Sequence, residues 1–308
     1  MALSQNHSDI GRIFLTGARG RLASCVKPYL HQAGHEIISF SRAATKDHLK
    51  LEDIFQPDIL EQGNTLLHFA WSTLPATSER DIGSEWENDL PLLIKLLRRI
   101  VESPARESLH FIFFSSGGAV YGSGSDQPAC ELDPCRPLGW YAQAKVAAEE
   151  IIQIFGERHG LIYTILRVAN PYGFPVSPER AQGIVPHAFR CAYTGQALNL
   201  WGDGTALKDF LHYHDFNRGL KAVIDQRLTG TYNLASGYST TIKDIIRHIE
   251  KITQRSICIQ PGPTRPWDVQ TSRLDNRKLR LATHWNPQVS LIEGLKLTAQ
   301  EIDRRDFH

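Results

Sequence analysis

One tyrosine and one lysine have the residue types and the spacing that proton transfer requires. Tyr141 and Lys145 stand four residues apart in the segment YAQAK, where a helical pattern begins that runs to about His159. Four residues are about one helical turn, so the two side chains share a face. A neighbouring ammonium favours the phenolate, so we expect Lys145 to lower the pKa of Tyr141 from its usual value of about 10. The pair is a candidate acid–base unit for a substrate hydroxyl.

The same spacing also occurs on exposed amphipathic helices, and its meaning depends on the elements around it. Apolar runs that we predict as strands cover residues 12–16, 35–40, 65–70, 109–114 and 161–166. Helical patterns alternate with them, ending near residue 31, near residue 101 and near residue 159. This order predicts a right-handed, doubly wound parallel α/β sheet, buried on both faces. Ligands of such sheets gather at the carboxyl ends of the strands, and Tyr141 falls there.

Small residues follow the first strand. The segment TGARGRLA has Gly17 and Gly20 three residues apart, with Ala23 where a third glycine often stands. Such residues permit a tight turn, let a pyrophosphate approach the backbone, and leave free N–H groups at the start of the next helix. An ordinary tight turn would have similar residues, but the strand before and the helix after are the context that dinucleotide binding requires.

The chain divides into two parts of different character. Elements up to Asn170 are long and regular, whereas the stretch that begins there, NPYGFPVSPERAQG, is rich in Pro and Gly. We expect residues 1–170 to form a dinucleotide-binding domain, with residues 205–235 returning to it. Residues 171–204 and 236–308 are expected to form a smaller, substrate-binding α/β lobe.

The end of the second predicted strand bears on the choice of dinucleotide. Sheets that bind NAD usually place a carboxylate there for the ribose hydroxyls, and this chain has Ser41 followed by Arg42. Arg19 lies in the glycine turn, so two guanidinium groups are available for a 2′-phosphate. The residues favour NADP as the cofactor, with NAD as the alternative. Arg19 and Arg42 could also be ordinary solvated surface residues without a role in binding.

Composition restricts the class of protein further. The 308 residues include 34 Lys plus Arg and 33 Asp plus Glu, for a formal net charge of +1. We therefore expect no nucleic-acid partner, and the apolar run at residues 92–101 is too short and too charged to indicate a membrane partner. Five cysteines without a Cys-x-x-Cys pair indicate free thiols and the cytoplasm. His212, His214 and Asp215 are potential metal ligands, but no metal is expected.

Several ordered motifs carry a family resemblance along nearly the whole chain. They are TGARGRLA, HFAW at 68–71, SSGGAVYG at 115–122, YAQAK, RVANPYG at 167–173, LWGDGTALKDFLHYHD at 200–215, RPWDV at 265–269 and WNP at 285–287. With them the chain resembles the extended short-chain dehydrogenase/reductases, the NAD(P)-dependent nucleotide-sugar epimerases and dehydratases similar to UDP-galactose 4-epimerase. The resemblance implies a Rossmann domain and a nucleotide-sugar substrate. It also implies a homodimer that pairs through the helix bearing Tyr141.

The resemblance further implies roles for individual residues. Lys145 would also hold the nicotinamide ribose, Asp53 would lie near the adenine, and Ala70 would lie beside the cofactor. Asn170 belongs to the turn that contacts the substrate's diphosphate. Lys208 and Arg265 fall where the family places basic phosphate ligands, although Lys208 stands where an arginine is usual and lacks its bidentate fork.

The sequence departs from the family pattern at the third catalytic position. Family members have Ser or Thr three residues before the Val of the VYG turn, and this chain has Gly117 there. We assign the hydroxyl role to Ser116, with Ser115 as the alternative; a serine that only satisfies the strand end is an equal interpretation. Gly118 and Ala119 stand where dehydratases have an Asp-Glu pair, which disfavours elimination.

Three hypotheses about function follow. The first is a nucleotide-sugar epimerase that oxidises a sugar carbon, expected to be C4, and reduces the ketone on its other face. The second is an NADPH-dependent reductase of a nucleotide 4-keto-sugar, which uses the same residues once. The third, prompted by Gly117, is a catalytically impaired dinucleotide-binding sensor. A reductase of a small carbonyl without a nucleotide would not need Lys208 and Arg265 in one pocket.

Overall fold

Alternation along the first strand places hydrophobic side chains in two separate cores. The computed structural model describes residues 11–124, 127–174 and 183–303. Strand β1 covers Arg12–Thr16, with Ile13 and Leu15 in one core and Phe14 in the other. Successive side chains of a strand point to opposite faces, so a strand buried on both sides must be apolar throughout. This is the reason for the uninterrupted apolar runs in the sequence.

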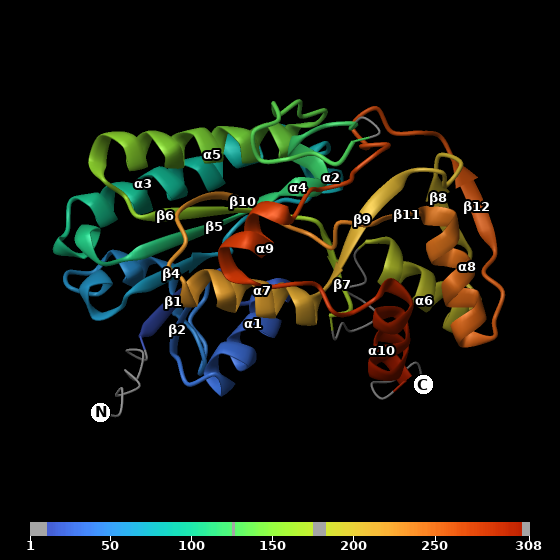
Figure 1. The fold of residues 1–308 in the computed structure, drawn as a ribbon, viewed down its shortest axis with the longest axis horizontal. Helices are drawn as coiled ribbons and strands as arrows, with labels where there is room; N and C mark the ends of the chain where they lie inside the picture. The colour runs from blue at the N-terminus through green and yellow to red at the C-terminus, as the bar shows by residue number, and fades with distance from the viewer. Residues whose placement is uncertain (1–10, 125–126, 175–182, 304–308) are drawn as a thin grey trace.

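Seven parallel strands form the central sheet, in the spatial order β10-β6-β5-β4-β1-β2-β3 (Figure 1). The strands besides β1 are β2 Glu36–Ser41, β3 Leu49–Lys50, β4 Thr65–His68, β5 His110–Ser116, β6 Tyr163–Val168 and β10 Gly230–Leu234. Every neighbouring pair in this sheet is parallel. The order reverses at β1, so the carboxyl ends of β1 and β4 border the crevice where doubly wound sheets bind ligands.

Helices cover both faces of the sheet. Helices α1 Arg21–Gln32 and α7 Tyr213–Asp225 pack together on one face, and α3 Leu90–Val101 and α5 Trp140–His159 pack together on the other. The shorter helices beside them are α2 Pro75–Ser78, α4 Gly117–Val120, α9 Arg277–Thr283, η1 Leu51–Phe55, η2 Leu60–Gln62, the π-helical η3 Glu85–Asp89, and η4 Pro104–Glu107. The predicted doubly wound α/β fold is therefore confirmed.

The smaller lobe has its own hydrophobic core (Figure 1). Its helices are α6 Ile184–Thr194, α8 Ile242–Thr253 and α10 Leu291–Asp303, and its strands are β7 Asn170–Tyr172, β8 Leu198–Trp201, β9 Leu207–His212, β11 Ser239–Thr241 and β12 Ile259–Gly262. Strands β11, β9 and β7 form a three-stranded sheet, and β12 pairs with β8. The chain crosses back to the large domain for α7 and β10, which join the first core and the central sheet.

A buried carboxylate connects the lobe to the central sheet. Asp209 of β9 accepts hydrogen bonds from the Ser236 hydroxyl at 2.6 Å and from the backbone N–H groups of Ser236 and Gly237 at 3.0 Å each. Those two residues follow β10 directly, at the carboxyl edge of the large sheet. Asp209 therefore fixes the lobe over the edge where ligands of this fold bind.

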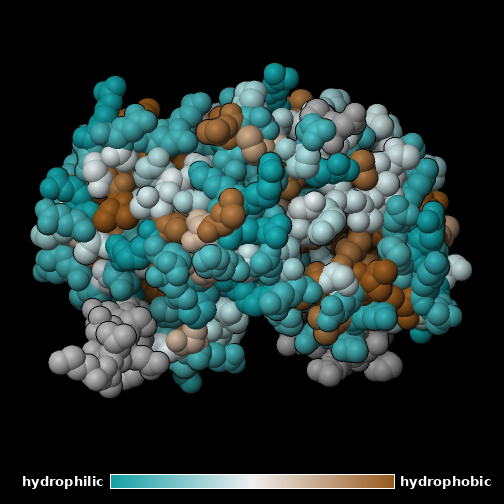
Figure 2. All heavy atoms as spheres, viewed as in Figure 1, coloured by the Kyte–Doolittle hydropathy of each residue, from teal (hydrophilic) through white to brown (hydrophobic). Residues whose placement is uncertain are grey.

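The surface is largely hydrophilic. Figure 2 shows polar residues over most of one face, with hydrophobic residues gathered in separate spots. Among the described helices, none is long and apolar enough to cross a bilayer.

Candidate active site

The glycine turn and the end of β4 lie against each other. Gly17 has a φ of 70°, and a Cβ at this residue would lie 2.6 Å from the backbone nitrogen of Ala70. Helix α1 then begins after Gly20 with no side-chain cap and no acidic residue in its first turn. The N–H groups of that turn are thus oriented toward any anion placed before the helix. This cradle fits the pyrophosphate of a dinucleotide.

Positive charges surround the end of β2. Arg19 and Arg42 are both exposed. Burial lowers the pKa of His48 and the charge of Lys27 lowers it further, Asp47 opposes this change, and Arg19 adds to it, so Arg19 lies near the turn that follows β2. The Ser41 hydroxyl donates to the carbonyl of Ala43 at 2.6 Å. The last residue of β2 and the one after it are thus Ser41 and Arg42, and the nearby turn holds both cations and the Asp47 carboxylate.

Asp53 lies farther along this edge and has a local role in the structure. Its carboxylate accepts the backbone N–H of Lys50 at 2.9 Å and the Nε2–H of Gln56 at 3.1 Å. These bonds cap the short helix η1. The contact to adenine that the family resemblance implies for Asp53 stays a prediction.

Tyr141 and Ser116 form the hydroxyl pair of the site. Ser116 ends β5 and precedes α4, and Tyr141 lies in the first turn of α5. The Ser116 hydroxyl lies near enough to the phenol to lower the pKa of Tyr141, and the Tyr141 residue is half-buried. Helix α5 starts here because the Glu79 carboxylate accepts the backbone N–H of Trp140 at 2.9 Å, which caps the helix.

Lys145 lies one turn after Tyr141 and is only 4% exposed. Its ammonium donates to the carbonyl of Phe114 at 3.0 Å. It also lies 3.6 Å from the ring centre of Trp71 and 5.8 Å from that of Tyr141. Cation–π contact and the carbonyl thus hold the charge on the α5 face that also carries Tyr141.

The pKa values of the pair differ from the expectation. Burial raises the pKa of Tyr141 to about 12, the Ser116 hydrogen bond lowers it, and the charges of Glu85 and Asp89 raise it. Burial lowers the pKa of Lys145 to about 7, against the opposing effect of Asp89, Glu149 and Glu85. We expected Lys145 to lower the pKa of Tyr141, but that pKa is raised, because loss of solvation disfavours the phenolate, and Lys145 is not among the groups that shift it.

The glycine at the third catalytic position is required by its neighbours. A Cβ on Gly117 would lie 2.5 Å from Cδ1 of Leu274 and 3.0 Å from the carbonyl oxygen of Arg167. A serine cannot be accommodated there without displacing backbone. The hydroxyl that contacts Tyr141 therefore comes from the preceding residue, Ser116.

A buried polar network supports this loop. Arg167 of β6 binds the Glu149 carboxylate of α5 with Nε at 3.0 Å and Nη2 at 2.7 Å. The Ser115 hydroxyl donates to the same carboxylate. Arg167 Nη1 reaches the Tyr121 hydroxyl at 2.9 Å, which in turn donates to Asn233 of β10 at 2.8 Å. The network joins three strands to the helix of Tyr141 and Lys145.

The three residues expected to bind substrate have different surroundings. Asn170 donates to the backbone carbonyl of Asp209 at 2.9 Å, and its side chain borders the catalytic loop, since a Cβ on Gly118 would lie 3.2 Å from it. Arg265 stacks 3.9 Å from the ring centre of Trp201. Asn170 thus lies between the loop and the lobe, and Arg265 lies on the lobe.

Lys208 has protein partners in this structure. Its ammonium binds the Asp268 carboxylate at 2.9 Å and the carbonyl of Val269, and its role as a phosphate ligand stays a prediction. Burial lowers the pKa of Arg265, the charge of Asp268 opposes this, and the charge of Arg80 adds to it. Lys208 and the half-buried Arg265 therefore flank one carboxylate, and the exposed Arg80 lies near Arg265.

The sequence analysis did not identify the residues whose charges and ring surround Tyr141 and Lys145. Trp71 ends the HFAW motif but was given no role there, and Glu85 and Asp89 belong to η3, outside every motif named above. The one available signal was the acidic segment EWEND directly before an apolar helix. Within the described parts of the chain, no group of three or more His, Cys, Asp and Glu side chains is arranged to hold a metal.

The fold and the site together define a dinucleotide-dependent enzyme of the short-chain dehydrogenase/reductase class. A family model described as the NAD dependent epimerase/dehydratase family matches residues 13–235, and the chain belongs to that family. The family resemblance predicted from the sequence motifs is thereby confirmed.

Individual relatives match over almost the full length. The UDP-glucose 4-epimerase of Mycolicibacterium smegmatis is 26% identical over 312 residues, 94% of this chain and 97% of the relative. The crystal structure of Thermotoga maritima UDP-glucose 4-epimerase with UDP-glucose has a TM-score of 0.85 and 27% identity, covering 95% of this chain and 99% of that one. The Thermus thermophilus UDP-glucose 4-epimerase complex with NAD, at 24% identity, shares the fold with a TM-score of 0.85, covering 96% and 100%.

A serine introduced at position 117 should destabilise the protein. Because its Cβ would overlap Leu274 and the carbonyl of Arg167, Gly117→Ser is expected to lower the free energy of unfolding by about 1–3 kcal/mol. Thermal denaturation measures this loss. The loss should be smaller in a Leu274→Ala background, where one of the two clashes is gone; equal losses in both backgrounds would contradict the crowding argument.

Proposed function

We propose that this protein is a UDP-sugar 4-epimerase that works through a transient 4-keto-sugar. The observation that carries the proposal is the Ser116–Tyr141–Lys145 arrangement at the carboxyl edge of the sheet, in a chain whose full-length relatives are named UDP-glucose 4-epimerases. A sugar hydroxyl placed beside Tyr141 and Ser116 would have both groups within hydrogen-bonding reach.

The chemistry assigned to each residue follows from its position. Bound at the glycine turn, an oxidised dinucleotide would supply the hydride acceptor and a positive charge that favours the phenolate. Tyr141 takes the proton of the sugar hydroxyl as the carbon–hydrogen bond breaks, and returns it when the ketone is reduced on its other face. Ser116 orients the sugar oxygen, and Lys145 stabilises the proton transfer and holds the nicotinamide ribose.

Cations from both parts of the chain support a nucleoside diphosphate as the anionic part of the substrate. Arg265 and the exposed Arg80 are close enough to repel each other, and Lys208 borders the same carboxylate as Arg265. Three cations that share one carboxylate leave positive charge for a diphosphate, which a small neutral carbonyl would not need. Asn170, at the junction of loop and lobe, is the proposed polar contact to the diphosphate.

The second candidate function is NADPH-dependent reduction of a nucleotide 4-keto-sugar. The observation that favours it is the cationic surroundings of Arg19 and Arg42 without a carboxylate at the end of β2, which support NADP over NAD. A reductase exchanges its cofactor in every turnover, whereas an epimerase retains it. We rank the epimerase first because several relatives that match over almost the full length are named UDP-glucose 4-epimerases.

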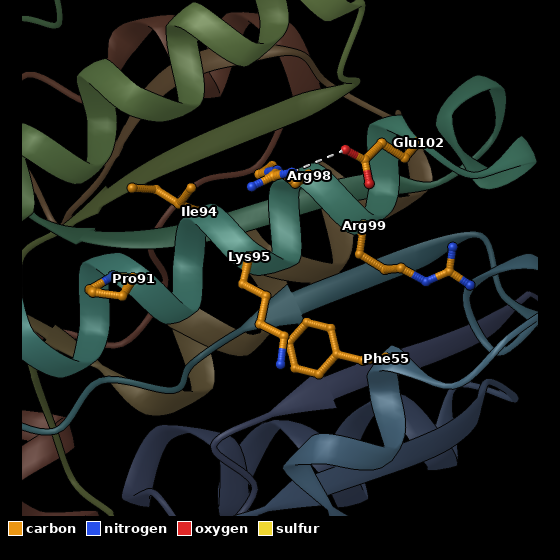
Figure 3. Close-up of a pocket in the computed structure, with 7 residues that line it drawn as sticks. All are labelled: Phe55, Pro91, Ile94, Lys95, Arg98, Arg99 and Glu102. Carbon is orange, nitrogen blue, oxygen red and sulfur yellow. Dashed lines mark ion pairs between the residues drawn. The ribbon is translucent and has the colours of Figure 1, made fainter.

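We also propose a homodimer that pairs through α3 and α5. These adjacent helices carry exposed isoleucines, Ile94 with 37% and Ile154 with 48% of its surface accessible. Figure 3 shows a groove on α3, where Lys95 reaches the ring of Phe55 at 4.1 Å. The groove is lined by Phe55, Pro91, Ile94, Lys95, Arg98, Arg99 and Glu102. Apolar residues on a charged helix face are typical of a subunit contact.

Removing the Tyr141 hydroxyl should abolish most of the activity. Tyr141→Phe is expected to lower kcat for interconversion of UDP-glucose and UDP-galactose about 10²–10⁴-fold, because the proton acceptor is lost. Product analysis by chromatography measures the rate. Tyr29→Phe, a partly buried tyrosine on α1, is the matched control and should retain the rate. Full activity in Tyr141→Phe would contradict the assignment.

Reversing the charge at Arg42 should change the preference for the cofactor. Arg42→Asp is expected to weaken NADPH binding at least about tenfold, since a charge-assisted hydrogen bond contributes roughly 1.5–3 kcal/mol, and to affect NADH much less. Calorimetric titration of both cofactors measures the effect. The control is Arg106→Asp, an exposed arginine on η4. Equal losses for NADPH and NADH would refute the preference for NADP.

A charge on the proposed subunit contact should separate the dimer. Ile154→Glu is expected to shift the mass measured by light scattering from dimer to monomer, because a carboxylate would be desolvated in the contact. Leu281→Glu changes a residue that is 81% exposed on α9 and should leave the dimer intact. A wild-type protein that is monomeric at micromolar concentration would overturn the proposal.

A further inference from the structure

The π-helical turn η3 lies directly beside the start of α5. It connects the segment that follows β4 to helix α3, and its Trp86 packs edge-on against Trp140 with ring centres 5.9 Å apart. Tyr141 is the next residue after Trp140. Single π-helical turns are unfavourable and occur frequently at functional sites.

Both ends of this turn carry buried carboxylates. Asp89 is 5% exposed and accepts the backbone N–H of Ser72 at 2.9 Å and its hydroxyl at 2.6 Å. Glu85 is 0% exposed and accepts a hydrogen bond from the Thr73 hydroxyl. The other carboxylate oxygen of Glu85 is buried without a hydrogen-bond partner among the described residues. A carboxylate in such surroundings is costly unless a cation compensates it.

Lys145 lies beside the segment that binds both carboxylates: its ammonium is 3.6 Å from the ring centre of Trp71, and the next two residues, Ser72 and Thr73, donate to Asp89 and Glu85. The charges of Asp89 and Glu85 both act on Lys145, and so does that of Glu149 on its own helix. Glu149 is already engaged by the bidentate bond to Arg167, so its charge is largely neutralised. Asp89 and Glu85 have no ion-pair partner of their own within 4 Å in the described parts of the chain. The acidic turn and the buried ammonium therefore compensate each other.

We propose that Glu85 and Asp89 are positioning residues, which supply from the π-helical turn the counter-charge that keeps Lys145 cationic beside Tyr141. The proposal rests on the proposed function for its kinetic consequence. Neither carboxylate needs to touch the substrate, because a charge acts through a medium of low dielectric constant over several ångströms.

The direction of the effect follows from the signs of the charges. Burial lowers the pKa of Lys145 to about 7, and the carboxylates oppose that change. Removing one negative charge lets the pKa of Lys145 fall further, so its ammonium is lost at a lower pH. The same change lowers the pKa of Tyr141, which Glu85 and Asp89 raise. Loss of the ammonium moves the alkaline limb of the activity profile toward lower pH, and the lower pKa of the phenol moves the acidic limb, which the phenolate sets, in the same direction.

The groups that face the pair come from each element packed around it. From η3 they are Glu85 and Asp89, and from α5 Glu149. From β4 the group is His68, whose pKa burial lowers to about 3 with a further lowering by Lys145, so it is neutral in the relevant range. From β5 the contacts are the uncharged Ser116 hydroxyl and the Phe114 carbonyl.

The test is the pH profile of kcat/KM for the proposed epimerase reaction in Glu85→Gln. The amide keeps an oxygen for the Thr73 hydroxyl and removes the charge. We expect the alkaline midpoint to fall by about one pH unit, a tenfold change in proton concentration, with KM at the acidic plateau unchanged. Glu87→Gln removes an exposed carboxylate from the same turn and should leave the profile where it is. A Glu85→Gln profile that superimposes on the wild type overturns the proposal.

Asp89→Asn provides an independent variant if Glu85→Gln does not fold. It keeps an acceptor for Ser72 and should shift the midpoint in the same direction; an unshifted profile counts against the proposal. The pH dependence of dinucleotide binding provides a readout separate from turnover. If the wild-type protein binds a dinucleotide but converts no UDP-sugar, the proposed function fails. In that case the pH midpoint of dinucleotide binding tests the charge proposal separately. The proposal predicts that this midpoint falls in Glu85→Gln, and an unchanged midpoint overturns it.

Discussion

The ion pair between Arg167 and Glu149 is the interaction on which the geometry of the site depends. It joins β6 to α5 by two short bonds and is almost fully buried, with side-chain exposures of 7% and 3%. Removing one partner of such a pair typically costs about 3–5 kcal/mol, since the other charge is left uncompensated. Helix α5 is therefore held in one position along its axis, and the position of Tyr141 follows from it.

The same pair also determines the shape of the loop opposite the helix. Ser115 donates to the Glu149 carboxylate, so the next residue, Ser116, is directed to Tyr141. Arg167 contributes its carbonyl as well, which leaves no space for a Cβ at Gly117. The proposed catalytic hydroxyl, that of Ser116, therefore stands one residue earlier than in the family pattern, because the network fixes the loop and leaves no room for a side chain at position 117.

Local sequence patterns were sufficient to predict the sheet and its helices but not the ion pairs and pKa values of the site. Apolar alternation, the glycine turn and the Tyr-x-x-x-Lys spacing are features of short segments, and they predicted the doubly wound sheet and the position of Tyr141 correctly. The pairing of Lys208 with Asp268 joins residues 60 positions apart, and η3 approaches α5 only in the folded chain. Such contacts depend on tertiary packing, which no periodicity records. The pKa expectation failed for the same reason, since burial is a property of the whole fold.

Low dielectric surroundings explain why the site needs so many charges. Burial favours the neutral form of both Tyr141 and Lys145, so it raises one pKa and lowers the other. Proton transfer to Tyr141 needs the opposite, a phenolate beside a cation. Carboxylates near Lys145 keep that cation available, but they also raise the pKa of Tyr141 and so oppose the phenolate. In a water-poor site these strong interactions place the transferred proton precisely, and they also restrict the pH range in which Tyr141 and Lys145 have the required charges.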